Sequence, residues 1–372
     1  MRLLKVKAKN FRKCKDEIVI DFVPMYKKSE VDKTYELNEI DEKLYSFVST
    51  AIIGKNVSGK TSVIDLINIS YKLIENFRLT DEIISISKTN LELFFYYNKT
   101  IYYYSTNLIS NSNISNDLHF DNEVLKYKKY TKTNIDKIFE VDSMKDVDIK
   151  AEYPDTISKL AFVFKNIHNY MDYYDDSDED KYTYHESYQM YKDNVIDIEL
   201  WNSLIRLFDG SINDLKEEES GLFLINNEKR ITAEELFYML SKGTSKGIAL
   251  YTLVIKSLLQ GTVLLVDEIE NHFHKTLVEN IISLYRDKKV NKNGASIVFT
   301  THYIELLDSF NRNDNIWITK CDDRKINLTN MYRDYGVRND YIKSKGFYAN
   351  AYDTNVDYDR LMDIKRRLIN EK

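Results

Sequence analysis

The stretch IIGKNVSGKTSV, residues 52–63, decides the fold of this chain. It places two of only 10 glycines five positions apart, and Lys-Thr follows the second glycine. The apolar run SFVSTAII before it predicts a buried strand. The segment SVIDLINISYKLIENF after it has apolar side chains at helical spacing. Strand, glycine-rich turn and helix therefore follow one another directly.

This turn matches GxxxxGK[ST], the pattern of a phosphate-binding loop. Its glycines allow a wrap in which backbone N–H groups face phosphate oxygens, and the start of the helix adds partial positive charge. We expect Lys60 to neutralise β and γ phosphates and the Thr61 hydroxyl to ligate Mg²⁺. The candidate nucleotide-binding residues are Gly54, Lys55, Asn56, Val57, Ser58, Gly59, Lys60, Thr61 and Ser62.

Two later strands end in polar side chains that suit the same chemistry. VLLVDEIENHFH, residues 263–274, predicts a buried strand that delivers Asp267 to Mg²⁺ and Glu268 as general base. IVFTTHYIEL, residues 297–306, ends a strand at His302, a position from which a side chain reaches a γ-phosphate. The alternatives are an acidic surface turn and a packed or capping histidine. A metal cluster of Glu270, His272 and His274 is disfavoured.

A fourth motif, LSKGTSKG at residues 240–247, precedes a helix and suits an anion-binding helix start. Alone it is weak, because many helices are capped by Ser. We expect a break in the helical pattern from Ser241 to Gly247. The motif is informative because it occurs in order with the three others: phosphate loop, LSxG, Asp-Glu pair and histidine.

The composition of the chain limits the class of protein to which it can belong. The chain has 372 residues and only two cysteines, Cys14 and Cys321, which suggest a reducing, cytoplasmic setting. No window approaches the roughly 18 apolar residues of a membrane span, so no membrane partner is expected. A formal charge of −6 argues against a surface that is basic throughout.

The remaining pattern is α/β. RLLKVKAKNF and EIVIDF predict paired strands, and LELFFYYNKTIYYYSTNL, residues 91–108, predicts a hairpin that turns at Asn98 and Lys99. We expect one ATPase-like domain over 1–372, divided into a phosphate-loop lobe (1–110), a mainly helical insertion (111–220), a lobe with the later motifs (221–330) and a helical tail (331–372).

The ordered motifs resemble the ABC-type ATPases, in the branch that includes RecF, SMC and OLD proteins. KNFRKCKDEIVIDF is similar to the opening hairpin of that branch, DEIENHFHKTL to its DEIE segment, and FTTHYIELLD to its TTHSPELLD segment. The late stretch YGVRNDYIKSKGFYANAY is similar to one in small RloA-like and AbiLi-like ATPases of prokaryotic abortive-infection loci. The resemblance covers most of the chain outside residues 110–220.

The resemblance implies a mixed parallel sheet, ATP and Mg²⁺ as ligands, and a composite site. Lys60, Glu268 and His302 would act on ATP in one protomer, while Ser241, Gly243 and Lys246 approach it from a second protomer. It implies a homodimer or higher homo-oligomer that regulates antiphage defence through a separate effector, a nuclease or toxin. Tyr303, Phe273 and the lack of a glutamine between Thr61 and Tyr188 depart from the family pattern and imply slow or conditional turnover.

Three other classes remain as alternatives. A RecF-like ATPase would bind DNA through a basic strip formed by Lys126, Lys128, Lys129, Lys132, Lys365, Arg366 and Arg367. A scaffold would bind ATP with little turnover. A transporter ATPase is disfavoured, since LSKGT replaces LSGGQ. Nothing in the sequence separates an active hydrolase from the scaffold.

Overall fold

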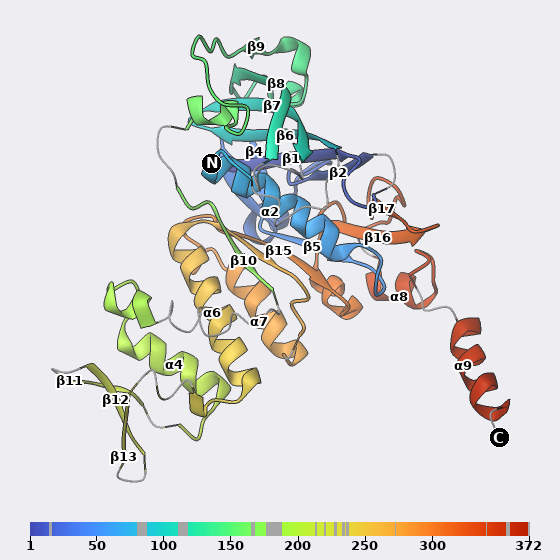
Figure 1. The fold of residues 1–372 in the computed structure, drawn as a ribbon. Coiled ribbons are helices and arrows are strands. Elements are labelled where there is room, and N and C mark those ends of the chain that lie inside the picture. The colour runs from blue at the N-terminus through green and yellow to red at the C-terminus, as the bar shows by residue number, and fades with distance from the viewer. Residues whose placement is uncertain are drawn as a thin grey trace. The chain divides into compact units, whose positions relative to one another are not determined.

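The computed structural model describes residues 1–14, 17–79, 88–110, 118–164, 168–175, 188–212, 214–218, 221–226, 229–232, 235, 238–271, 273–339, 341–354 and 358–370. The chain divides into two compact units. The first unit combines residues 1–167 with 300–372, and the second comprises residues 168–299. The second unit is therefore inserted, in sequence, into the first (Figure 1).

The first unit contains a six-stranded sheet in the order β2-β1-β6-β7-β8-β9, with every pair antiparallel. Its strands are β1 (Arg2–Lys9), β2 (Glu17–Asp21), β6 (Lys88–Tyr97), β7 (Thr100–Ser110), β8 (Leu118–Lys129) and β9 (Lys145–Asp146). Asn98 and Lys99 turn β6 into β7 with φ of 47° and 55°. Two left-handed residues make a tight hairpin turn that matches the twist of the strands. The predicted hairpin is confirmed.

The same unit holds three strands of a mixed sheet. β5 (Ser49–Ile53) is fully buried and pairs in parallel with β16 (Ile316–Asp322), which pairs antiparallel with β17 (Lys325–Asn330). α2 (Lys60–Asn76) begins after the glycine-rich turn, as predicted. β16 and β17 were not predicted. The pairing of β16 with β5 could not be read from the sequence, because no local pattern indicates it.

The first unit also contains several smaller elements. They are α1 (Glu30–Tyr35), β3 (Leu37–Asp41), β4 (Leu44–Phe47), η2 (Ile135–Lys137), η3 (Val141–Ser143), η4 (Lys159–Phe162), η5 (Ile304–Ser309), α8 (Lys343–Tyr348) and α9 (Tyr358–Asn370). The helical segments α8 and α9 agree with a helical tail after residue 331.

A buried charged cluster joins distant parts of the first unit. Arg312, with 0% exposure, donates to both oxygens of Asp314 at 2.9 and 2.6 Å and to Asp32 at 2.9 Å. Its guanidinium lies 3.8 Å from the centroid of the Tyr26 ring. Asp32 also closes a capping box with Ser29 at the start of α1. The cluster therefore links α1 to the segment that enters β16.

The second unit places three parallel strands beside two helices (Figure 1). The strands are β10 (Met171–Tyr174), β14 (Val263–Val266) and β15 (Ser296–Thr301), and the helices are α6 (Lys242–Gln260) and α7 (Lys275–Arg286). α4 (Ile198–Phe208) packs on α6, and β11 (Lys216–Glu218), β12 (Gly221–Asn226) and β13 (Lys229–Thr232) form an antiparallel sheet. The predicted parallel pairing of β14 and β15 is confirmed.

Two expectations are corrected. Over the described residues of 111–220, β8, β9, β10 and short 3₁₀ turns replace the mainly helical insertion, and α4 is its one full helix. The expected break at Ser241–Gly247 is shorter than predicted, since residues 238–239 are helical, Leu240 and Ser241 are not, and α6 runs unbroken from Lys242. A Cβ on Gly247 would lie 2.2 Å from Cε1 of Phe208, so close packing of that ring requires glycine within the helix. Packing here overrides the low helix propensity of glycine.

Neither cysteine forms a disulfide, and burial raises the pKa of Cys14 to about 12. In the described part of the chain, no helix combines the length and apolar character that a membrane crossing requires.

Candidate functional site

The glycine-rich turn joins the buried strand β5 to α2. Gly59, the N-cap of α2, has a φ of 102°, a left-handed conformation that glycine adopts without strain. It provides no side-chain acceptor for the N–H groups of the first helical turn. A helix start of this kind attracts anions through those N–H groups and the helix dipole. Val57 at the loop tip is 92% exposed and has a φ of 63°, which is rare for a β-branched residue.

The loop rests on Thr319 of β16, a residue that the sequence did not reveal. Thr319 Oγ1 lies 2.6 Å from Ser58 Oγ and donates to the carbonyl of Ile53 at 3.3 Å. A Cβ on Gly54 would lie 2.2 Å from Thr319 Oγ1 and 2.6 Å from its carbonyl oxygen. Gly54 is therefore required by the approach of two backbones, and Thr319 forms the floor of the loop.

We expect Gly54→Ala to lower the free energy of unfolding by about 1–3 kcal/mol, because the new methyl collides with the backbone of Thr319. Gly210→Ala is the matched control, since no atom lies within 4 Å of its Cβ position. Urea unfolding followed by circular dichroism measures both variants. Equal stability of the two would contradict the close packing of the loop.

Lys60 lies between the loop and the end of β15. Its side chain is buried, and its Nζ donates to the carbonyls of Gly54 at 3.3 Å and Lys55 at 3.5 Å. His302 Nε2 lies 2.9 Å from the same Nζ. An ammonium group only donates, so a hydrogen bond between these two atoms requires the tautomer in which His302 Nε2 is the acceptor. The structure thus brings together two residues that the sequence selected 242 positions apart.

Asp267 and Glu268 follow β14 in the second unit, as predicted. The backbone N–H of Asp267 donates to the carbonyl of Tyr174 at 3.0 Å, which extends the sheet by one residue. Glu268 has a φ of 51°, and its carboxylate accepts a hydrogen bond from Asn271 Nδ2 at 2.8 Å. A non-glycine residue in the left-handed region carries strain, and such residues cluster at functional sites. Both carboxylate residues are half-buried.

The LSxG motif forms the start of α6 instead of a separate loop. Ser241 is the exposed N-cap, and its Oγ accepts from the backbone N–H of Thr244 at 3.1 Å. Gly243 lies in the first turn of the helix. Lys246 is only 8% exposed, whereas Lys242 is exposed. Of the three predicted signature residues, Ser241 is the most accessible to a partner.

The residues that follow the Asp-Glu pair, some of them considered above as metal ligands, have structural roles. His274 is the exposed N-cap of α7 and accepts from the N–H of Thr276. Phe273 is buried, and its ring centroid lies 6.4 Å from that of Phe208. His272 lies outside the described residues. Within the described ranges, no group of three or more His, Cys, Asp or Glu side chains is arranged to hold a metal ion.

A phosphate loop between a buried strand and a helix, within a mixed α/β fold, defines a P-loop ATPase. The chain belongs to the family described as "AAA domain, putative AbiEii toxin, Type IV TA system", whose model matches residues 49–308. This match confirms the predicted relation to ATPases of abortive-infection loci. The helices and mixed sheet of the structure confirm the α/β fold class.

Among solved structures, the chain is similar to the SMC head domain from Thermotoga maritima, with 14% identity and a TM-score of 0.45. The alignment covers 89% of this chain and 99% of that domain. No curated protein matches the sequence.

Proposed function

We propose that this chain binds Mg-ATP and hydrolyses it slowly, as the regulatory subunit of an antiphage defence system that controls a separate effector chain. The family description, which names a toxin and a toxin–antitoxin system, supports the defence setting. The phosphate loop and the two later motifs support the chemistry. The cytoplasm is the proposed location.

The residues fit the proposed ligands. The uncapped start of α2 and the Lys60 ammonium suit phosphate oxygens, and the exposed Thr61 hydroxyl suits a hard cation. Mg²⁺ would supply charge neutralisation at the β and γ phosphates. In the second unit, Asp267 is the proposed Mg²⁺ ligand and Glu268 the proposed acceptor of the proton of the attacking water.

One observation carries the proposal of slow, conditional turnover: Lys60 already has acceptors from its own chain. Two carbonyls and His302 surround its Nζ at 2.9–3.5 Å. Binding of a triphosphate must exchange at least the imidazole contact for phosphate oxygens. His302 would then be released toward the γ-phosphate, the role predicted for it. Nucleotide binding and the position of His302 are thereby coupled.

The composite site is proposed to form in a homodimer. Exposed Ser241 and the neighbouring Gly243 stand at a helix start that can face the nucleotide of a second protomer. Burial of Lys246 makes it the least accessible member of the set. The signature contact is therefore proposed to depend mainly on Ser241.

The solution mass of Glu268→Gln, with and without Mg-ATP, tests this function. Because the variant retains the phosphate loop but lacks the general base, we expect a monomer that doubles in mass only with ATP. Lys60→Ala is the control and is expected to remain monomeric under both conditions. Light scattering coupled to gel filtration measures the mass.

Three outcomes would contradict parts of the proposal. A larger assembly that persists without nucleotide would support the scaffold alternative. A protein that remains monomeric with Mg-ATP would rule out the composite site. Rapid phosphate release by the unmodified protein alone would overturn the slow turnover.

In the basic strip of the DNA-binding alternative, three of the seven residues pair with a carboxylate of their own chain. Lys126 pairs with Asp146 at 3.9 Å, Lys132 pairs with Glu42 at 3.3 Å, and Lys128 donates to Ser143 Oγ at 2.8 Å. In the tail, Arg367 pairs with Asp363. No observation here favours DNA clamping over the regulatory function.

A further inference from the structure

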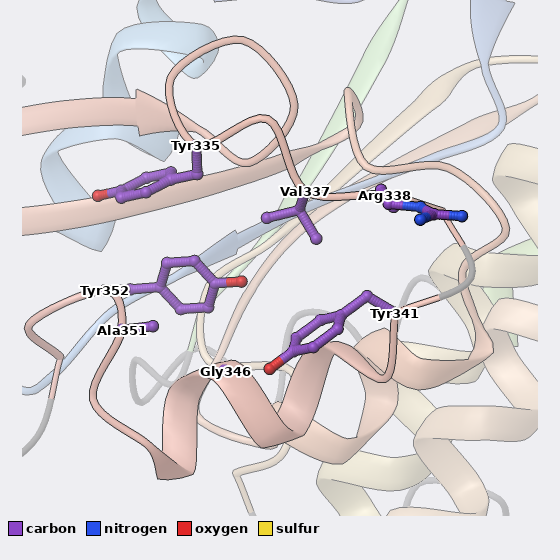
Figure 2. A pocket seen from close by; sticks show the side chains of 7 residues that line it. All are labelled: Tyr335, Val337, Arg338, Tyr341, Gly346, Ala351 and Tyr352. Atoms are coloured by element: carbon purple, nitrogen blue, oxygen red, sulfur yellow. The ribbon is translucent and has the colours of Figure 1, made fainter.

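A hollow lies in the first unit, between the segment that follows β17 and the turn after α8 (Figure 2). Its volume is about 540 Å³, within the usual range for small-molecule sites. Three tyrosines, Tyr335, Tyr341 and Tyr352, line it together with Arg338 and small apolar residues. None of these residues belongs to the phosphate loop or the later ATPase motifs.

The wall of the hollow is a packed aromatic cluster. The Tyr352 ring meets Tyr335 edge to face, with centroids 5.0 Å apart and an interplanar angle of 82°, and it packs on Phe347 at 4.6 Å. Gly346 permits this packing, because its Cβ would lie 2.7 Å from the Tyr352 ring and hydroxyl. The rings are therefore held in place before any ligand arrives, which lowers the entropy lost on binding.

The Tyr352 hydroxyl points into the hollow (Figure 2). The residue is only 3% exposed, and among the described residues this hydroxyl has no hydrogen-bond partner. Burial raises the pKa of Tyr352, so the hydroxyl keeps its proton and can donate. The hydroxyl oxygen itself is not buried, and it is open to the hollow. A ligand that offers an acceptor would satisfy it.

The mouth of the hollow offers two further groups with complementary chemistry. Tyr341 is 46% exposed and presents a ring on which a planar group can stack. Arg338 is exposed and lies on the side of the hollow opposite to Tyr335, with its guanidinium directed outward (Figure 2). A guanidinium suits a phosphate through paired hydrogen bonds. Aromatic faces, one hydroxyl donor and one cation are the groups that a planar, hydrogen-bonding anion requires.

We propose that this hollow binds a single nucleotide unit, with its base against Tyr341 and Tyr352 and its phosphate at Arg338. The Tyr352 hydroxyl donates to an acceptor on the base. A free nucleoside monophosphate and a nucleotide within a single strand share this chemistry. The site is separate from the phosphate loop, and its occupancy does not depend on ATP hydrolysis.

The test uses the full chain with Lys60→Ala, which removes nucleotide binding at the phosphate loop. Fluorescein-labelled U6 and dT6 hexamers are titrated by fluorescence anisotropy, and uridine and adenosine monophosphates are titrated by calorimetry. We expect Tyr341→Ala to weaken binding roughly 5- to 100-fold, Arg338→Ala about 10-fold and Tyr352→Phe about 3- to 10-fold.

Two matched variants control for surface effects. Tyr348→Ala removes an exposed tyrosine of α8 outside the lining, and Arg333→Ala removes an exposed arginine of the same segment; each should change binding less than about 2-fold. Binding of the monophosphates identifies a free nucleotide as ligand, and binding of hexamers alone identifies a strand. Absence of binding by every probe up to about 1 mM, or binding that the three lining variants leave unchanged, would overturn the proposal.

Discussion

Lys60→Ala is expected to reduce ATP turnover about 100- to 1,000-fold, the loss typical when one donor to the reacting charge is removed. Lys60 is buried at the start of α2, and its Nζ is the cation that the loop carbonyls and His302 hold in place. Alanine leaves the phosphates without that charge. Phosphate release and titration of a fluorescent ATP analogue measure turnover and affinity.

Lys55→Ala is the matched control in the same loop. Its backbone N–H remains, and its side chain is less buried than that of Lys60, so turnover should stay within about 3-fold of the unmodified protein. Circular dichroism verifies that both variants fold. If Lys60→Ala kept more than a tenth of the activity, the assignment of this loop as the phosphate site would fail.

Arg312→Met is expected to lower the free energy of unfolding of the first unit by about 3–5 kcal/mol. The change leaves Asp32 and Asp314, both buried, without their shared cation. Trp317 is fully buried in this unit, so its fluorescence in a Trp201→Phe background reports urea unfolding of this unit alone.

The decrease in the free energy of unfolding caused by Arg312→Met should also depend on pH. Burial raises the pKa of Asp314, and removal of Arg312 raises it further. A carboxyl whose pKa is higher in the folded state favours folding at low pH and opposes it as pH rises. The deficit of Arg312→Met should therefore be smaller at pH 4 than at pH 7. Exposed Arg333→Met breaks the pair with Asp334 and removes the guanidinium that lies 5.4 Å from the centroid of the Trp317 ring, and it should cost at most about 1 kcal/mol at both pH values.

The phosphate loop could be predicted because its signals are local. Strand, glycine-rich turn and helix occupy consecutive residues, and the turn at Asn98 and Lys99 likewise depends on the two residues that form it. Lys60 and His302 were predicted to act on the same nucleotide, from the end of a strand and the family resemblance, and the structure places the two side chains in contact.

The position of Thr319 beneath the phosphate loop could not be predicted in the same way. Thr319 meets Ile53 across 266 residues, and no local pattern selects β16 as the neighbour of β5. The continuity of α6 through Gly247 depends on contact with Phe208, which a propensity argument does not include. β8 was not predicted, and its place in the sheet depends on pairing with β7 and β9.

The distance along the chain between β5 and Thr319 also sets the order of events during translation. Ile53 leaves the ribosome 266 residues before the threonine that supports the loop. At 5–20 residues per second, that interval is on the order of 15 to 50 s. Throughout this time the nascent loop lacks its floor and the His302 contact of Lys60. A chain whose synthesis stops early would therefore carry the phosphate-loop sequence without an assembled site.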